Sequence, residues 1–286
     1  MGDSLVWING KVTGIEEATV SLEDRGFVFG DGVYEVVRTY GGAPFAMAEH
    51  MARFERSAAG IELAPPFGGA EMAGIALDLL HQVDVPEAEL YFQLTRGAAR
   101  RYHPFPEGVP PTLVIWARPL RHTDPALRDQ GVTAITHPDE RWARCDLKTI
   151  CLLPNVLAKE HARRAGAFEA ILVRDGLVTE GAGSNVAIVK DGTLITPIAD
   201  RRILPGITRA VVLRLARELG ISVVERDVPL NELFEADEVF TLATTAELMP
   251  VVSTDNTPIG LGAPGPVMTR LFKALRRLAT GSAASH

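Results

Sequence analysis

Lysine is scarce in this chain, and one lysine has unusual neighbours. The 29 basic side chains include only five lysines, and one of these, Lys148, lies in RWARCDLKTICLLPNVLAK, a segment whose flanks are apolar for a surface position. A lysine in apolar surroundings loses its proton more easily, and the free amine can form a Schiff base with a carbonyl. Taken alone, a structural lysine with its stem on apolar surface and its ammonium in water is the simpler interpretation.

Three further segments carry groups that suit a phosphorylated pyridine cofactor. Glu180, followed by Gly-Ala-Gly-Ser, is a carboxylate on a tight turn, and such a group can keep a pyridine nitrogen protonated. A helix beginning near Gly206 would offer free N–H groups to a phosphate, with the Thr208 hydroxyl beside them. Thr244 and Thr245 add hydroxyls after an apolar run. Each also has a purely structural interpretation: Glu180 as an acid in a turn, the residues near Gly206 as a helix cap, and the two threonines as ordinary polar residues.

A second set of donors suits a substrate carboxylate. Arg101 and His103 are separated by one residue, so in an extended segment both side chains lie on one side, and an arginine can grip a carboxylate with two hydrogen bonds. Tyr34 would add a donor if it faced the same cleft. Taken in isolation, a solvated basic loop is the favoured interpretation of the pair. For Arg53, on a predicted helix, a structural salt bridge is the default interpretation.

Composition narrows the class of protein. The 286 residues carry a formal net charge of −7 with no basic stripe, which argues against nucleic acid as a partner. We find no signal peptide and no apolar stretch of the roughly 18 residues needed to span a bilayer, so we expect no membrane association. Two cysteines without a Cys/His cluster suggest reduced thiols, no metal site and a cytoplasmic protein.

The periodicity of apolar residues predicts an α+β fold of two domains. Strands and helices do not alternate regularly and no GxGxxG motif follows a strand, so a Rossmann domain is not expected. A polar, proline-containing stretch at 121–131 is predicted as a linker between an N-terminal domain (1–120) and a C-terminal domain (132–286). The main predicted helices are 50–60, 69–83, 153–165 and 206–219; 27–39 is a strand or strand–helix junction; and hairpins turn at Asn9-Gly10, Asp175-Gly176 and Asp191-Gly192.

Eight segments carry a resemblance to one family. They are EDRGFVFGDGVYEVVR (23–38), EHMARFERS (49–57), YFQLTRG followed by Arg101-Tyr102-His103, RWARCDLK (141–148), LLPNVLAK (152–159), VTEGAGSN (178–185), LPGITR (204–209) and TTAE (244–247). In this order and spacing the chain resembles the D-amino-acid aminotransferases of pyridoxal-phosphate fold type IV. The resemblance implies a small N-terminal α/β domain and a larger C-terminal domain with a barrel-like sheet.

The resemblance also implies residue roles. Lys148 would form the Schiff base with pyridoxal 5'-phosphate and shuttle the substrate's α-proton, and Glu180 would bind the pyridine nitrogen. The substrate would be a D-amino acid, D-alanine with 2-oxoglutarate as acceptor, in a ping-pong reaction, and the enzyme would be a homodimer whose partner subunit supplies part of the carboxylate trap. The remaining cofactor residues would be Arg53, Ile207, Thr208, Thr244 and Ser184, and the substrate carboxylate would be held by Tyr34, Arg101 and His103.

Alternatives within the fold are a branched-chain L-amino-acid aminotransferase, an aminodeoxychorismate lyase and an (R)-amine transaminase. Arg101 with His103 counts against all three. A non-catalytic cofactor-binding protein is disfavoured because both Lys148 and Glu180 are present. The chain departs from the family pattern at Ala182, Gly183 and Ala243, where the resemblance leads us to expect serine hydroxyls near the cofactor. Cofactor affinity and substrate range are the properties that these departures affect.

Overall fold

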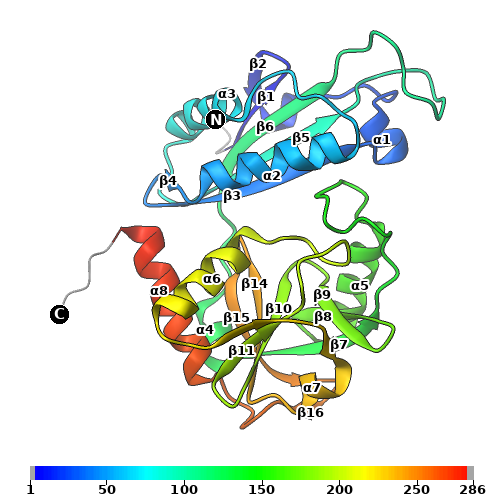
Figure 1. The fold of residues 1–286 in the computed structure, drawn as a ribbon. Helices are drawn as coiled ribbons and strands as arrows, with labels where there is room; N and C mark the ends of the chain where they lie inside the picture. Colours follow the sequence, from blue (N-terminus) through cyan, green and yellow to red (C-terminus); the bar gives the residue numbers. More distant parts are fainter. Residues whose placement is uncertain (1–3, 282–286) are drawn as a thin grey trace. The chain divides into compact units, whose positions relative to one another are not determined.

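The computed structural model describes residues 4–281, which divide into two compact units (Figure 1). The first unit comprises the chain up to Arg121 together with the later segment Leu147–Cys151. The second unit comprises His122–Asp146 and the chain from Leu152 onward. The stretch predicted as a linker, 121–131, contains helix α4 (Pro125–Gln130), which Asp124 caps and which belongs to the second unit. No described helix is long and apolar enough to cross a membrane.

The first unit is a six-stranded sheet covered by two helices. Within the described residues its strand order is β2-β1-β6-β5-β3-β4, antiparallel throughout. Helices α2 (Met47–Gly60) and α3 (Gly69–Val83) contact each other and pack on the sheet (Figure 1). The strands are β1 (Leu5–Ile8), β2 (Lys11–Gly14), β3 (Gly32–Tyr40), β4 (Ala43–Pro44), β5 (Ala88–Thr95) and β6 (Thr112–Pro119).

The start of β3 differs from a plain strand. Residues 25–29 form the short helix α1 (Arg25–Phe29), whose N-cap Asp24 accepts a hydrogen bond from Gly26 N. The helix stops because Gly30 takes a left-handed conformation with φ of 68°, which glycine adopts without steric cost. The chain then enters β3. Residues 27–39 were predicted as either a plain strand or a junction between strand and helix, and the junction is confirmed.

The second unit is built on a larger sheet that curls on itself (Figure 1). Its main strand order is β12-β11-β10-β14-β15-β7-β8-β9-β13, with β16 paired to β15. Both predicted Asp-Gly hairpins are present, with positive φ at both turn residues in each. The strands are β7 (Val132–Pro138), β8 (Glu169–Arg174), β9 (Leu177–Gly181), β10 (Asn185–Lys190), β11 (Thr193–Thr196), β12 (Val223–Glu225), β13 (Val228–Pro229), β14 (Glu238–Ala243), β15 (Glu247–Thr254) and β16 (Thr257–Pro258).

Apolar side chains from successive strands fill the inside of this curled sheet, among them Val132, Ile171, Val186 and Met249. Helices cover it outside: α5 packs on β7 and β8, while α6 and α8 pack on each other and on β14. The helices are α5 (Leu153–Arg164), α6 (Ile207–Glu218), α7 (Leu230–Phe234) and α8 (Pro266–Thr280). The predicted α+β class, with a barrel-like sheet in the C-terminal domain, is confirmed.

Candidate active site

Lys148 belongs to the segment Leu147–Cys151, which runs beside strand β3 in the first unit. Its carbonyl oxygen accepts a hydrogen bond from Tyr34 N at 2.9 Å, and its own N–H donates to Ser57 Oγ at 3.1 Å. The side chain is half-buried, and Nζ lies 4.3 Å from the centre of the Tyr34 ring. Strand β3 and helix α2 therefore fix the backbone of this lysine.

Beside Lys148, three buried polar side chains form one cluster. Arg53 grips the Glu35 carboxylate with two hydrogen bonds, Nε to Oε2 at 2.9 Å and Nη2 to Oε1 at 2.7 Å. His50 Nδ1 lies 3.0 Å from the same Oε1. His50 and Arg53 are three residues apart on α2, so both face β3, where Glu35 points toward the helix.

Charge in this cluster is concentrated on Arg53 and Glu35. Burial alone would raise the pKa of Glu35, but the guanidinium of Arg53, the hydrogen bond from His50 and the charge of Lys148 outweigh it and hold that pKa below its ordinary value. Burial lowers the pKa of His50, and its contact with Glu35 only partly offsets this. We therefore describe an ion pair of Arg53 and Glu35 with a neutral histidine beside it.

Tyr34 faces the opposite way from Glu35, because adjacent residues of a strand alternate. Its ring stacks on Tyr91 at 5.7 Å between centroids, and Tyr91 stacks on Trp116 at 3.8 Å. Burial raises the pKa of Tyr91, so its hydroxyl stays protonated and donates to Gln93. Three neighbouring strands, β3, β5 and β6, thus carry an aromatic row that supports Tyr34 from one side.

Arg101 and His103 lie in the loop 96–111 that joins β5 to β6, and both are exposed. The Arg101 guanidinium lies 5.2 Å from the centre of the Phe29 ring, and the His103 ring lies 5.4 Å from it. The intervening Tyr102 is 70% exposed. Arg101 and His103 therefore share one side of the loop, since a single aromatic ring contacts both.

In the second unit, Glu180 lies buried on strand β9 with donors on both carboxylate oxygens. Oε1 is paired with Arg141 Nη1, and Oε2 accepts from Asn185 Nδ2 at 2.8 Å and from Leu204 N at 3.1 Å. Burial raises the pKa of Glu180 to about 6 against the opposing effect of Arg141 and the Leu204 N–H. The carboxylate is therefore ionised at neutral pH and protonates in mild acid.

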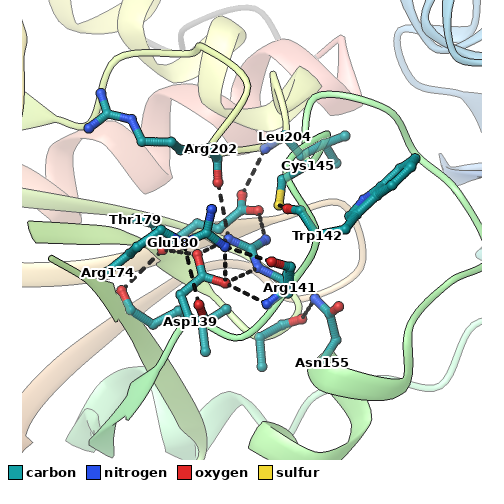
Figure 2. Close-up of polar contacts among 12 residues, drawn as sticks. Asp139, Arg141, Trp142, Cys145, Asn155, Arg174, Thr179, Glu180, Arg202 and Leu204 are labelled. Atoms are coloured by element: carbon teal, nitrogen blue, oxygen red, sulfur yellow. Dashed lines mark hydrogen bonds and ion pairs between the residues drawn. The ribbon is translucent and has the colours of Figure 1, made fainter. Parts of the chain in front are cut away.

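Arg141 is itself held rigidly (Figure 2). Its Nε and Nη2 each donate to Asp139 at 2.8 Å, and Nη2 also donates to the carbonyl of Arg202 at 3.1 Å. Arg174 and the Thr179 hydroxyl bind Asp139 from further positions, at 3.0 and 2.9 Å. Burial opposes the charge of Arg141, but the two carboxylates outweigh this and raise its pKa. Glu180 thus contacts an arginine that is permanently charged and fixed in place.

The predicted anion site begins helix α6, whose first intrahelical hydrogen bond runs from Ala210 N to Gly206 O. The N–H groups of Ile207 and Thr208 precede that bond and so have no acceptor within the helix. Both residues are half-buried. Asn185 joins this helix start to Glu180, because its Nδ2 also donates to the carbonyl of Leu204 at 2.9 Å.

Thr244 lies in the turn between β14 and β15 and is half-buried. The pairing of Asn185 with Leu242 places this turn at the end of the sheet where β10 begins. The predicted residues Glu180, Ile207, Thr208 and Thr244 are therefore gathered at one end of the curled sheet.

Ser184 has a different neighbour. Its hydroxyl donates to Glu169 Oε2 at 2.9 Å, and Lys159 Nζ binds the other oxygen of that carboxylate at 3.1 Å. The structure thus brings Ser184 to Glu169, whereas the Glu180 carboxylate is held by Arg141, Asn185 and Leu204.

Comparison with known proteins identifies the family. The sequence model of the family described as amino-transferase class IV matches residues 32–254. The chain belongs to the class IV aminotransferases.

Curated relatives align with nearly the full length of this class IV aminotransferase. It is 44% identical over 271 residues to D-alanine aminotransferase of Bacillus licheniformis, covering 95% of each chain. It is 42% identical over 273 residues to D-alanine aminotransferase of Staphylococcus haemolyticus, covering 95% of this chain and 96% of the relative.

Solved structures show the same fold. Branched-chain amino acid aminotransferase of Escherichia coli superposes with a TM-score of 0.91 at 31% identity, covering 99% of this chain and 96% of that one. The branched-chain enzyme of Thermobaculum terrenum, solved in its pyridoxal-phosphate form, gives 0.87 at 29% identity, covering 98% and 94%. This class IV aminotransferase is a pyridoxal-phosphate-dependent enzyme.

The residues present fit that cofactor. Glu180 is a buried carboxylate, and each of its oxygens has two lone pairs, so Oε1 retains room for a further donor besides Arg141. The start of α6 provides N–H groups without an acceptor inside the helix, which suits a phosphate. The first unit carries a half-buried lysine, Lys148, whose amine can form a Schiff base with an aldehyde.

Three polar residues that contact predicted site residues were not singled out from the sequence: Glu35, Arg141 and Asn185. All three lie inside the segments that carry the resemblance, so the segments marked the region without marking the residues. A weak signal existed for Glu35, since it is an acid in an apolar strand facing a helix with His50 and Arg53 three residues apart. Arg141 and Asn185 gave no local signal, because their partners are distant in the chain.

Proposed function

We propose that this class IV aminotransferase moves the amino group of D-amino acids, with D-alanine as donor and 2-oxoglutarate as acceptor, by a ping-pong reaction. The observation that carries the proposal is the pairing of Arg101 and His103 on Phe29. An arginine and a histidine on one side of a loop present several donors to a carboxylate. The 44% identity to a D-alanine aminotransferase supports the same substrate class.

Tyr34 completes the proposed substrate site. Its ring is supported by Tyr91, which leaves the hydroxyl to bind the substrate carboxylate together with Arg101 and His103. Because these three donors choose which end of the substrate is held, they also decide which face of the α-carbon meets the lysine. The preference for D-amino acids follows from that choice.

The cofactor would be bound at both of its ends. Glu180, held by Arg141 and Asn185, would keep the pyridine nitrogen protonated. Bound pyridoxal phosphate supplies an electron sink for the substrate's α-carbon. The residues proposed for its phosphate are Arg53, the N–H groups of Ile207 and Thr208, and the hydroxyls of Thr208 and Thr244, with Ser184 at the edge of the cofactor site.

Proton transfer would fall to Lys148. Its amine would hold the cofactor in the resting enzyme, and after the substrate displaces it, Nζ would remove the proton from the α-carbon and later return a proton. The adjacent Tyr34 ring, 4.3 Å from Nζ, limits the positions that the amine can take. Restricting a catalytic group to few positions lowers the entropy cost of reaching the reacting geometry.

The proposed enzyme is a homodimer in which Arg101 and His103 serve the partner subunit. Both side chains are exposed on the single chain, so they are available to another copy. Mixing Lys148→Ala chains with Arg101→Met chains tests this arrangement. If the trap crosses the interface, one site of each mixed dimer has both native residues and activity returns. If each chain supplies its own trap, every site carries one substitution and no activity returns.

A branched-chain L-amino-acid aminotransferase is the second candidate, because the solved structures with TM-scores near 0.9 carry that name. A half-reaction screen separates the two. The holoenzyme is mixed with single D- or L-amino acids and the visible absorbance of the cofactor is followed. Bleaching by D-alanine but not L-leucine is the expected result. Bleaching by L-leucine alone would reject the proposed function in favour of the second candidate.

A further inference from the structure

Outside the residues assigned so far, the first unit contains a buried arginine that contacts the loop of Arg101 and His103. Arg25, the first residue of helix α1, is only 4% exposed. We propose that Arg25 is a positioning residue, which holds the loop 96–111 in the conformation that presents Arg101 and His103 to the substrate carboxylate. The inference rests on the proposed function of those two residues and adds a determinant of specificity to it.

Arg25 binds the backbone of the loop at three successive residues. Nη1 donates to the carbonyl of Tyr102 at 2.6 Å and, more weakly, to that of Pro104 at 3.4 Å, while Nη2 donates to the carbonyl of His103 at 3.1 Å. A guanidinium has five N–H donors in a rigid plane, which suits a cluster of carbonyl groups. The contacts turn these carbonyls toward Arg25 and fix the backbone on which His103 stands.

The charge of Arg25 is balanced by an acid that also serves a second arginine. Asp31 accepts from Arg25 Nε at 2.7 Å and from Arg96 Nε at 3.0 Å. The Arg96 guanidinium lies 3.6 Å from the centre of the ring of Phe105, the next residue along the same loop. Two buried arginines around one carboxylate therefore contact four consecutive residues of the loop, 102–105, and the network is largely shielded from solvent.

The base of the loop is fastened to the same short helix. Arg25 N donates to the carbonyl of Gly97 at 2.9 Å, and Ala99 N donates to the carbonyl of Glu23 at 3.1 Å. Asp24, the N-cap of α1, also accepts from the Thr95 hydroxyl at 2.9 Å. Helix α1 is thus hydrogen-bonded directly to the start of the loop.

Phe29, the last residue of α1, links Arg25 to the side chains of Arg101 and His103. Its ring contacts Arg101 and His103, and the Arg25 guanidinium lies 4.8 Å from its centre. One short helix therefore carries both the donor that fixes the loop backbone and the ring on which the two functional side chains rest. Loss of Arg25 would leave the carbonyls of residues 102–104 without this partner and free the loop to adopt other conformations.

The expected consequence is weaker recognition of the carboxylate without loss of proton chemistry at Lys148. The test compares the unmodified holoenzyme with its Arg25→Met, Arg25→Lys and Arg101→Met variants in steady-state transamination. The amino donor is either D-alanine or D-alaninol, which has no carboxylate. For Arg25→Met we expect the KM for D-alanine to rise by about ten- to a hundredfold, because misplacing a positioned group by about 1 Å can cost that much. The kcat should change far less, and the rate with D-alaninol should equal that of the unmodified enzyme.

Arg25→Lys keeps a charge beside Asp31 but lacks the planar fork, so its KM should lie between those of Arg25→Met and the unmodified enzyme. This variant also keeps the test open if Arg25→Met does not fold. Arg38→Met is the matched control, because Arg38 is a buried arginine of the same unit, paired with Glu87 at 2.7 Å and lying over Tyr40. It should lose thermal stability while its KM for D-alanine stays unchanged.

The outcomes separate this inference from the function on which it rests. A raised KM in Arg101→Met together with an unchanged KM in both Arg25 variants would overturn the positioning role and leave the carboxylate trap intact. An equal loss with D-alanine and D-alaninol would show general damage and would also overturn it. An unchanged KM in Arg101→Met would reject the trap itself, and the positioning role with it.

Discussion

The Lys148 amine lies 4.3 Å from the centre of the Tyr34 ring, and the backbones of these two residues are joined by a hydrogen bond of 2.9 Å from Tyr34 N to Lys148 O. The strand that carries Tyr34 therefore also fixes the base of the lysine side chain. A change at Lys148 that keeps the backbone will leave this hydrogen bond in place, so the chemistry of the amine can be tested separately from the fold.

Lys148→Ala should abolish turnover with D-alanine, because it removes the amine proposed to take the α-proton. Lys148→Arg should be equally inactive, since a guanidinium stays protonated and cannot act as a base. The measurement is steady-state activity together with the half-reaction seen by cofactor absorbance. Both variants should keep the circular dichroism spectrum of the unmodified protein, and substantial residual turnover in either would contradict the assignment.

Glu180→Gln should slow the half-reaction by about a hundredfold or more, the size of effect seen when a preorganised electrostatic partner is removed. Glutamine has nearly the same shape but cannot balance a protonated pyridine nitrogen. Asp139 still binds Arg141 at two positions, so the arginine remains paired and the protein should fold. Stopped-flow absorbance with D-alanine measures the rate. A rate within a few-fold of the unmodified enzyme would exclude the proposed role of Glu180.

The rate of the half-reaction should depend on pH through the ionisation of Glu180, which gives its pH profile an acidic limb. Burial raises its pKa to about 6, so the carboxylate is ionised above that pH and becomes protonated below it. The protonated form cannot balance a positive pyridine nitrogen. In the holoenzyme that positive charge itself favours the ionised carboxylate, so the half-reaction rate should fall only at pH values below about 6. The Glu180→Gln variant should be slow at every pH and lack this limb. An identical limb in the variant would assign it to another group.

Local patterns were sufficient for most of the fold. The helix predicted at 69–83 is α3 (Gly69–Val83), and the helix predicted at 206–219 is α6 (Ile207–Glu218). The Asp-Gly hairpins are present because positive φ at both turn residues is a local requirement. These features depend on residues within one turn or one repeat of each other, so a single sequence contains the information.

Features that depend on distant residues were not predicted. The segment Leu147–Cys151 belongs to the first unit, although the chain has already entered the second. The buried pairs of Glu35 with Arg53, and of Arg141 with Glu180, join residues 18 and 39 positions apart. A charged residue is expected to be exposed unless its partner is known, so these two buried pairs could not be predicted from the sequence.

Glu35→Gln should destabilise the protein by about 3–5 kcal/mol at neutral pH, because it leaves the buried charge of Arg53 without its carboxylate. The pKa of Glu35 in the folded protein lies below its ordinary value of 4.5, so the stabilisation is complete above that pH and is lost as the pH falls below it. The gap between the unmodified protein and the variant in urea unfolding should therefore narrow below pH 4.5.

The control for this prediction is Glu89→Gln. Glu89 pairs with Arg118 at 2.7 Å, but the Arg118 side chain is 49% exposed, and a surface ion pair contributes about 1 kcal/mol or less. Equal losses in the two variants would mean that the Glu35 carboxylate does not stabilise the cluster more than a surface pair does.

Gly206→Ala should weaken cofactor binding. A Cβ at this position would collide with the Oδ1 atom of Asn185. The Nδ2 atom of the same side chain donates both to Glu180 and to the carbonyl of Leu204 just before α6. The helix start or the asparagine must shift, and either shift separates the proposed phosphate site from the proposed pyridine partner. Titration of the apo-protein with pyridoxal phosphate, followed by absorbance, should give a raised Kd. Gly74→Ala in α3, where a Cβ meets nothing within 4 Å, should leave the Kd unchanged and stabilise the helix by about 1 kcal/mol. If both alanine variants bound the cofactor equally well, the close approach of Asn185 to Gly206 would have no part in forming the site.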